Sequence, residues 1–177
     1  HDITAVDWNF FYRCYQRTYL EHGNPPYLTR AFFTLMQEQM PEAWVLFVAE
    51  RGGQRIASSL IAISAYLSGF GAEKSLISTA YGRYWGALER VDCLHFEACY
   101  YQPIAWCIAQ GVQRFEGGAQ GEHKMARALM PVQAGSAHWL AHPAFAQAVD
   151  RFLAREGDGV AHYLADLRLR SPFKRSG

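Results

Sequence analysis

The sequence predicts a mixed α/β sandwich. Two helical patterns precede any strand, several β-rich runs follow one another with turns between them, and a helix, a strand and further helices close the chain. With 177 residues, half of them hydrophobic, the chain can bury roughly 70% of its unfolded surface. We therefore expect residues 1–177 to form a single domain around one core.

The first two elements are expected to be helices. Between Asp7 and His22, aromatic residues recur at three- and four-residue steps, and Gly23 follows as a stop signal. These residues are Trp8, Phe11, Tyr15 and Tyr19. Thr29 can cap a second helix, which Pro41 ends. The regular aromatic spacing indicates that the first helix faces the core.

A β-hairpin is expected next. Residues 43–63 contain two β-rich runs, and Gly52 and Gly53 between them can adopt the positive φ that a tight turn needs. Residues 65–78 are less regular, so we expect a loop or an extension of the hairpin there. The sequence thus places the first antiparallel pair before residue 64.

Two more strands are expected after this segment. The third covers residues 79–89 and the fourth residues 93–101. Alternation along the fourth strand would place His95 and Glu97 on one face of the sheet and Tyr100 on the other.

A helix and a fifth strand follow. Gln102 opens the helix with Pro103 in its first turn, Gly111 ends it, and residues 112–118 form the strand. A right-handed crossover through this helix would lay the fifth strand parallel to residues 93–101 and beside them. Because ligands of open α/β sheets bind at the carboxyl ends of the strands, we expect a cleft there.

The remaining residues are expected to form four short elements. Gly157 and Gly159 would separate the last two of them. The elements are a helix over 123–130, a strand over 136–140, and helices over 143–156 and 160–169.

Charge and cysteine usage exclude some classes of function. A formal net charge of +1 argues against a non-specific polyanion binder, although a local basic patch stays open. The chain starts at His1 without a charged segment and apolar run, so we expect neither a signal peptide nor a membrane span. The four cysteines are too scattered for a zinc or redox motif, which favours a cytoplasmic chain with reduced thiols.

Metal and hydrolase sites are not favoured. Glu122 and His123 are adjacent, and His138 and His142 are four apart, but no HExxH or CxxC framework accompanies them. A GxSxG elbow is also absent from the sequence. We therefore expect no metal ligands and no Ser/His/Asp triad.

The sequence does hold the groups that acyl transfer to an amine needs. Such a reaction requires a base for the ammonium proton and donors for the developing oxyanion. His95, Glu97 and Glu116 are the candidate catalytic bases, although each one alone could instead be a structural residue. The glycines after Glu116 let the backbone approach a ligand, or they form an ordinary connection into a helix.

Further residues are candidates for substrate binding. Lys124 and Arg127 lie three apart on a helix and could bind a phosphate or a carboxylate, or form a solvated basic face. Arg83 could point into a pocket, or lie on a solvent face with Tyr84 in the core. The complete set is Arg83, Trp85, Tyr100, Tyr101, Gly117, Gly118, Gln120, His123, Lys124 and Arg127.

Three sequence blocks resemble the FemAB-like predicted N-acyltransferases, described as peptidoglycan biosynthesis or recognition proteins. The blocks are YGRYWG at 81–86, HFEACYY at 95–101 and RFEGGAQGEHK at 114–124, and the resemblance extends over nearly the whole chain. It implies a fold like that of the GNAT acyltransferase superfamily, with a largely antiparallel central sheet flanked by helices. It also implies that the chain is the C-terminal half of a longer protein with two GNAT-like halves, so an N-terminal half would be a partner.

The resemblance implies an N-acyltransferase that moves an acyl or aminoacyl group to an amine of a peptidoglycan precursor or another small molecule. The donor would be aminoacyl-tRNA or acyl-coenzyme A, with no tightly bound cofactor. In GNAT enzymes a pyrophosphate loop, Q/RxxGxG/A, follows the fourth strand, whereas Gln102 is followed by PIAWC without a glycine. This departure favours the aminoacyl donor. The alternative is a non-catalytic recognition domain that binds a cell-wall precursor or a protein, and a homodimer is a further partner expectation.

Overall fold

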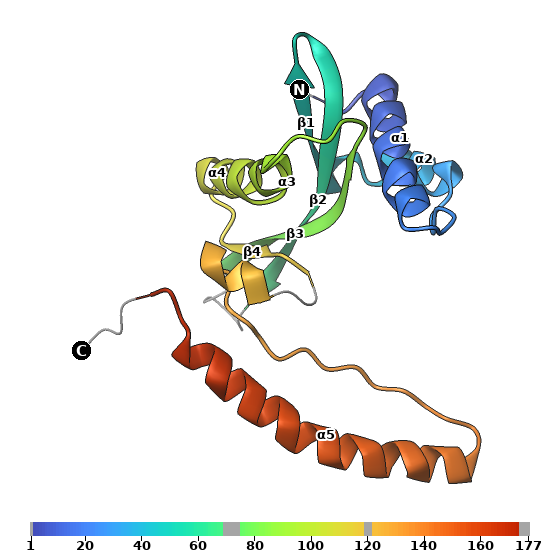
Figure 1. The fold of residues 1–177 in the computed structure, drawn as a ribbon, viewed down its shortest axis with the longest axis vertical. Coiled ribbons are helices and arrows are strands. Elements are labelled where there is room, and N and C mark those ends of the chain that lie inside the picture. Colours follow the sequence, from blue (N-terminus) through green and yellow to red (C-terminus); the bar gives the residue numbers. More distant parts are fainter. Residues whose placement is uncertain (1, 69–74, 119–121, 174–177) are drawn as a thin grey trace. The chain divides into compact units, whose positions relative to one another are not determined.

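The structure, a computed structural model, describes residues 2–68, 75–118 and 122–173. The chain divides into two compact units, His1–Ala119 and Gln120–Gly177. The first unit contains the β-sheet and the second contains a long helix (Figure 1).

Two capped helices open the first unit, as predicted. α1 (Ala5–Glu21) begins with a capping box, in which the Thr4 hydroxyl accepts a hydrogen bond from the Asp7 amide and the Asp7 carboxylate accepts one from the Thr4 amide. α2 (Arg30–Gln39) has the predicted N-cap, Thr29. Both caps satisfy amides that the first helical turn leaves without partners.

The sheet has four strands in the order β1-β2-β3-β4. β1, β2 and β3 pair antiparallel, and β4 pairs parallel to β3. Gly52 and Gly53 occupy the predicted hairpin turn with φ of 57° and 77°, which confirms the turn. The strands are β1 (Trp44–Arg51), β2 (Gln54–Ser68), β3 (Ser75–Ala87) and β4 (Arg114–Glu116).

Much of the segment predicted as a loop is strand. β2 runs on to Ser68 and β3 begins at Ser75, so the ladder extends from the Ser64–Thr79 pair to the Ser68–Ser75 pair. Of the two alternatives for residues 65–78, the extension of the hairpin matches the structure for these residues and the loop does not, because pairing between the strands overrides their weak individual strand signals. Residues 69–74 lie outside the described part of the chain.

The predicted fourth strand is wrong, since the chain from residue 94 to residue 109 is helical. The buried residues Ala98, Tyr100, Pro103 and Cys107 recur at two-, three- and four-residue steps, so the β-prone residues of 93–101 conceal a helical pattern. The segment consists of α3 (Leu94–Phe96), a π-helical turn (Glu97–Tyr101) and α4 (Gln102–Ala109).

The π-helical turn explains how the helix continues through Pro103. A proline ring clashes with the carbonyl four residues earlier in a regular α-helix. Here the Gln102 amide donates to the Glu97 carbonyl, five residues back, which widens the turn just before the proline. Pro103 therefore lies in the first turn of α4, as predicted, although a π-helical turn and not a strand precedes this helix.

The parallel strand pair is present, but with a different partner. β4 pairs with β3 from Thr79–Arg114 to Tyr81–Glu116, and not with residues 93–101. One helical segment joins the two strands, as the right-handed crossover rule requires for a parallel pair. The predicted fifth strand at residues 112–118 is confirmed over Arg114–Glu116.

Two hydrophobic clusters lie on opposite faces of the sheet. α1 and α2 cover one face and α3 and α4 the other (Figure 1). Leu60 of β2 packs with the helix aromatics Trp8, Phe11 and Phe33, whereas the next residue, Ile61, packs with Cys107 of α4. This alternation along β2 confirms a sandwich with helices on both faces.

The second unit departs further from the predictions. Its first described element is a 3₁₀ turn (Glu122–Arg127), which overlaps the predicted helix 123–130. Residues 136–140 form no strand: Trp139 is 86% exposed, and no described strand pairs with this segment. A single helix, α5 (Pro143–Leu169), replaces the two predicted helices, because a helix tolerates interior glycines at about 1 kcal/mol each.

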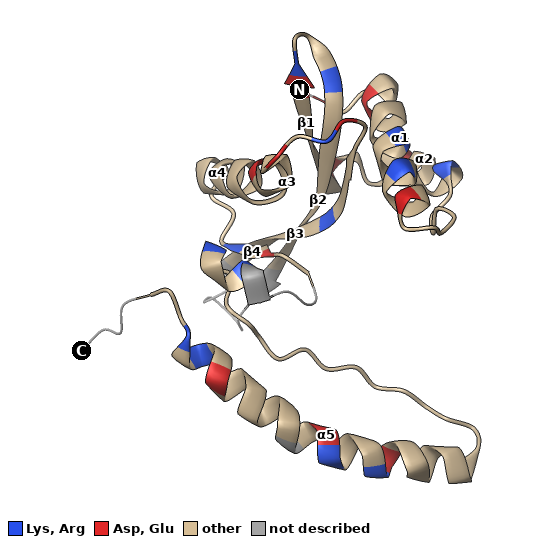
Figure 2. Ribbon diagram, in the orientation of Figure 1, with Lys and Arg blue, Asp and Glu red and all other residues tan. Residues whose placement is uncertain are grey.

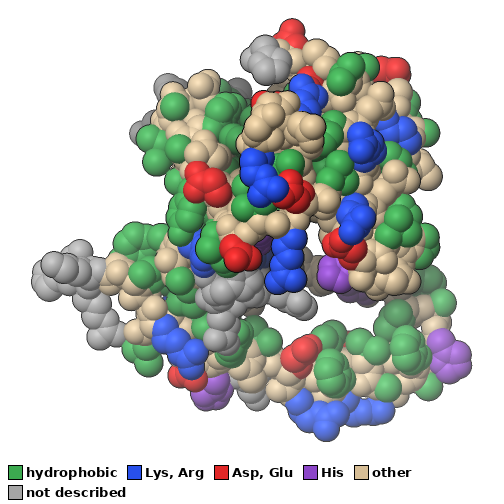
Figure 3. All heavy atoms as spheres, turned by 45° about the horizontal axis from the view of Figure 1, so that its top comes forward, with side chains coloured by type: hydrophobic (Ala, Val, Ile, Leu, Met, Phe, Trp, Pro, Cys, Tyr) green, Lys and Arg blue, Asp and Glu red, His purple; other side chains and the backbone are tan. Residues whose placement is uncertain are grey.

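Charged residues of both signs are intermixed. Figure 2 shows positive and negative residues along α1 and along the connection after β3, and Figure 3 shows no large single-sign region on the visible face. This distribution agrees with the near-neutral composition. None of the helices in the described ranges combines the length and the apolar character that a membrane crossing needs.

Candidate functional site

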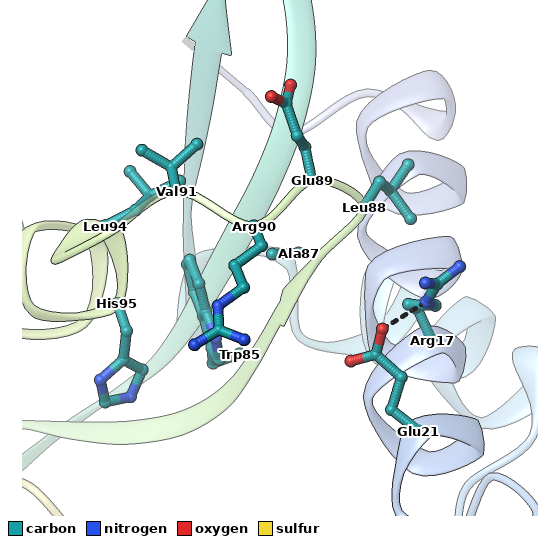
Figure 4. A pocket seen from close by; sticks show the side chains of 10 residues that line it. All are labelled: Arg17, Glu21, Trp85, Ala87, Leu88, Glu89, Arg90, Val91, Leu94 and His95. Carbon is teal, nitrogen blue, oxygen red and sulfur yellow. Dashed lines mark hydrogen bonds and ion pairs between the residues drawn. The ribbon is translucent and has the colours of Figure 1, made fainter.

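A pocket with a volume of about 510 Å³ lies where β3 ends, between α1 and α3 (Figure 4). Its residues come from four parts of the first unit: α1, the end of β3, the connection that follows β3, and the start of α3. They are Arg17, Glu21, Trp85, Ala87, Leu88, Glu89, Arg90, Val91, Leu94 and His95. The volume lies within the range of small-molecule sites.

Close packing of α1 on β3 brings the first two of these residues to the pocket. A methyl group at Gly86 would overlap the Cys14 carbonyl of α1, so only glycine allows the two backbones to approach this closely. The Thr18 hydroxyl donates to the Trp85 carbonyl at 3.0 Å. These contacts hold Arg17, one residue before Thr18, next to the end of β3.

A left-handed residue turns the chain into α3. Cys93 has φ of 64°, which is uncommon for a residue with a Cβ, and it precedes the first residue of the helix. The Leu94 amide donates to the Val91 carbonyl at 3.3 Å and closes the turn. The turn places the first residues of α3, including His95, at the pocket.

An aromatic wall supports His95. Its ring lies edge-on to the indole of Trp85, with centroids 5.5 Å apart, and edge-on to the ring of Tyr100 at 5.7 Å. Tyr100 is only 5% exposed. The imidazole is therefore held between one pocket residue and one core residue.

The charged residues of the pocket differ in their partners. Arg17 and Glu21 form an ion pair at 2.6 Å along α1, and Glu89 forms an ion pair with Arg51 of β1. Arg90 is exposed, and among the described residues it forms no ion pair. Figure 4 shows its side chain extending into the pocket between the other labelled residues.

Of the three predicted bases, His95 lines this pocket. Glu97 is exposed and accepts a hydrogen bond from the Gln102 side chain at 2.6 Å. Because residues two apart on a helix point in different directions, His95 and Glu97 do not share a face as the strand prediction required. Glu116 lies on β4 opposite Tyr81.

The predicted binding residues of the first unit are only partly brought together. Trp85 lines the pocket and Tyr100 packs behind His95, whereas Tyr101 is 51% exposed. Arg83 is exposed, with its guanidinium 5.7 Å from the ring of Tyr84, which packs against the core. The solvent-face interpretation of Arg83 therefore matches the structure, and a role for it in substrate binding stays a prediction.

The glycines after β4 lie close to the neighbouring strand. Gly118 has φ of 78°, and a Cβ added there would lie 3.9 Å from the carbonyl oxygen of Gly82. A Cβ on Gly82 would in turn lie 3.6 Å from the Glu116 carbonyl oxygen. Gly117 and Gly118 thus continue beside β3 just past the last strand pair, and they do not line the pocket.

The family model described as peptidoglycan biosynthesis/recognition, FemAB-like, matches residues 1–175. The chain belongs to the FemAB-like family. Among curated proteins, no match is found.

Solved structures show that this FemAB-like chain has the fold of GNAT acetyltransferases. A predicted acetyltransferase from Clostridium acetobutylicum, solved with acetyl-CoA, has a TM-score of 0.50 and 13% identity, and the match covers 82% of this chain and 95% of that one. A GNAT family acetyltransferase from Staphylococcus aureus has a TM-score of 0.50 at 8% identity, over 79% and 96% of the two chains. An aminoglycoside acetyltransferase from an uncultured soil sample has the same TM-score at 10% identity, over 80% and 93%.

The junction between strand and helix differs from the GNAT pyrophosphate loop in this FemAB-like chain. Since residues 94–109 are helical, the strand that precedes the helix is β3, and the loop to compare is residues 88–93, not the residues after Gln102. This loop contains no glycine and carries Glu89 and Asp92. The chain therefore still departs from the GNAT pyrophosphate loop, but at residues 88–93 and not after Gln102.

The predicted cationic residues lie in the second unit. Lys124 and Arg127 are three residues apart in the same 3₁₀ turn, and this spacing places them on one side of it. Burial lowers the pKa of Lys124. Gln120 and the side chain of His123 lie outside the described residues.

Three of the four thiols of the FemAB-like chain are poorly suited to nucleophilic chemistry. Burial raises the pKa of Cys14 and of Cys107, and it raises the pKa of Cys99 to about 12. These three thiols are therefore protonated at neutral pH. Among the described residues, no group of three or more His, Cys, Asp or Glu side chains could hold a metal ion.

The sequence missed the charged residues of the pocket. Arg17 and Glu21 carry a visible signal, because they are an oppositely charged pair four residues apart on a predicted helix. Glu89 and Arg90 were treated as the boundary of a strand. Their position would have been recognisable only if residues 94–109 had been predicted as helix.

Proposed function

We propose that the chain is an N-acyltransferase that transfers an acyl or aminoacyl group to an amine. The observation that carries this proposal is the family match over residues 1–175, on a chain with the fold of GNAT acetyltransferases. The acceptor is a peptidoglycan precursor or another small amine, in line with the description of the family. The donor is an aminoacyl-tRNA or an acyl-coenzyme A.

His95 is the base in this proposal, since it alone of the three candidates lines the pocket. Its neutral imidazole accepts a proton from the amine, and the amine nitrogen attacks the carbonyl carbon of the donor. As the N–C bond forms, the C–O bond of an ester or the C–S bond of a thioester breaks. The leaving oxygen or sulfur takes up a proton, and the product is an amide.

In this proposal, the carbonyl group of the donor lies beside the unpaired edge at the end of β3. Among the described strands, β4 pairs with β3 only from Thr79 to Tyr81, so from Arg83 to Ala87 the edge of β3 that faces away from β2 has no strand beside it. Backbone amides at such an edge can donate to a carbonyl oxygen as it gains charge. The loop over residues 88–93 lacks the glycines of a GNAT pyrophosphate loop, and this departure favours an aminoacyl donor.

Transfer assays with purified protein test the proposal. A muropeptide precursor is incubated with radiolabelled acetyl-coenzyme A or with aminoacyl-tRNA, and the labelled amide is identified by mass spectrometry. Replacement of the base in His95→Asn is expected to lower kcat by about 10²- to 10⁴-fold without loss of folding. The control is His138→Asn, an exposed histidine of the second unit, which should keep full activity.

The outcomes separate the candidate functions. Transfer that His95→Asn leaves unchanged would remove His95 as the base. Binding of the precursor by the wild type without transfer from either donor would instead favour a recognition domain, which the description of the family also names. The cytoplasmic location, a homodimer, a tRNA partner and an N-terminal GNAT-like half stay predictions.

A further inference from the structure

The pocket contains charges of both signs, but only some of them are neutralised by neighbours. Glu21 and Glu89 each form an ion pair with an arginine, on α1 and β1 respectively. Arg90, by contrast, lines the same pocket but forms no ion pair among the described residues. The pocket therefore contains one guanidinium whose charge a ligand can neutralise.

A guanidinium in this position favours a carboxylate as its ligand. Its planar fork of N–H donors matches the two oxygens of a carboxylate or a phosphate. A phosphate carries close to two negative charges, and Arg90 can neutralise only one of them, because the other arginine of the pocket, Arg17, is paired with Glu21. A carboxylate carries one negative charge, which the guanidinium of Arg90 matches.

We propose that the pocket binds an acceptor that carries a carboxylate as well as its amine, and that Arg90 binds the carboxylate. The inference rests on the proposed function, because it identifies the ligand of the pocket as the acceptor of the acyl group. The amine then lies towards the pocket wall formed by His95 and Trp85. Arg90 is a specificity-determining residue, which selects amino-acid-like amines over amines without a carboxylate.

Two probes that differ only at the carboxylate test the assignment. Nα-acetyl-L-lysine and Nα-acetyl-L-lysinamide have the same amine, but the second has an uncharged carboxamide. Binding to ¹⁵N-labelled protein is followed by NMR titration, with the indole N–H of Trp85 as a reporter in the pocket. Because a hydrogen bond between charged groups strengthens binding, the wild type should bind the carboxylate roughly tenfold more tightly.

The matched variants are Arg90→Gln and Arg13→Gln. Arg13 is also an exposed arginine of the first unit, but it does not line the pocket. Arg90→Gln should bind both probes equally, with an affinity close to that of the wild type for the carboxamide. Arg13→Gln should keep the wild-type preference.

The proposal is overturned if the wild type binds both probes equally, if the preference persists in Arg90→Gln, or if neither probe binds. It does not fail together with the proposed function. A preference that depends on Arg90, without amide formation in the transfer assay, would support the carboxylate site and refute the acyltransferase. Amide formation without such a preference would support the acyltransferase and refute the carboxylate site.

Discussion

Substitution of Gly86 by alanine should separate α1 from β3. The new methyl group would overlap the Cys14 carbonyl and lie 2.9 Å from the Thr18 hydroxyl oxygen. The Cys14 carbonyl belongs to helix backbone and cannot rotate away, so the whole helix must move. This movement would also break the hydrogen bond from Thr18 to the Trp85 carbonyl, which is 3.0 Å long in the native protein.

The expected cost combines two effects. Overpacking of a well-packed interface costs roughly 1–3 kcal/mol, and a lost hydrogen bond adds about 1 kcal/mol. We therefore expect Gly86→Ala to lower the free energy of unfolding by about 2–4 kcal/mol. The same shift would widen the pocket, because Arg17 and Glu21 move with the helix.

Urea denaturation measures this change, and Gly82→Ala is the matched control on the same strand. A methyl group at Gly82 would have its nearest neighbours at 3.6 and 3.9 Å, which are ordinary contacts. The control should therefore keep or gain stability, by up to about 1 kcal/mol. If Gly86→Ala stays within about 0.5 kcal/mol of the wild type, the typical change for a neutral surface substitution, the close approach of α1 to β3 would be refuted.

Three further substitutions test the fold. Asp7→Asn removes the ion pair with Arg55, 2.8 Å long, and should cost roughly 2 kcal/mol at pH 7. The hydrogen bond from the Thr4 hydroxyl is the main cause that holds the pKa of Asp7 below its usual value, so the carboxylate stabilises the fold above about pH 4 and loses this effect as the pH falls through the lowered pKa. In urea denaturation, the difference in the free energy of unfolding between the wild type and Asp7→Asn should narrow towards pH 3. A difference that does not change with pH would contradict this. In α5, Gly157→Ala and Gly159→Ala should each stabilise the helix by about 1 kcal/mol, since an added Cβ meets no atom within 4 Å. Circular dichroism at 222 nm checks this, and a loss of helical signal in either variant would contradict a continuous helix.

Local signals predicted much of the first unit. The aromatic spacing of α1, the cap at Thr29 and the glycines of the first hairpin each act within a few residues, and each is confirmed. Residues 93–101 misled the prediction, because their β-prone side chains alternate while the segment packs as a helix on the sheet. The widened turn before Pro103 depends on that packing, and no pattern of single residues indicates it.

The pocket was less predictable than the fold. It joins Arg17 to His95, which are far apart in the sequence and meet only because α1 approaches β3 at Gly86. A glycine inside a strand is a sign of close backbone approach, so the sequence held one clue to this contact. The predictions of His95 and Trp85 came close to the site, but the charged residues around them depend on the tertiary arrangement.

The pairing of β4 has a consequence for the order in which the sheet assembles. β1, β2 and β3 follow one another in the sequence, whereas β4 reaches β3 only after a helical segment and pairs through three residues. Closing a longer loop costs more entropy before any contact compensates for it. We therefore expect β1, β2 and β3 to form an antiparallel sheet first. β4 then pairs with the edge of β3 that is already in place, so it completes the sheet without having to nucleate it.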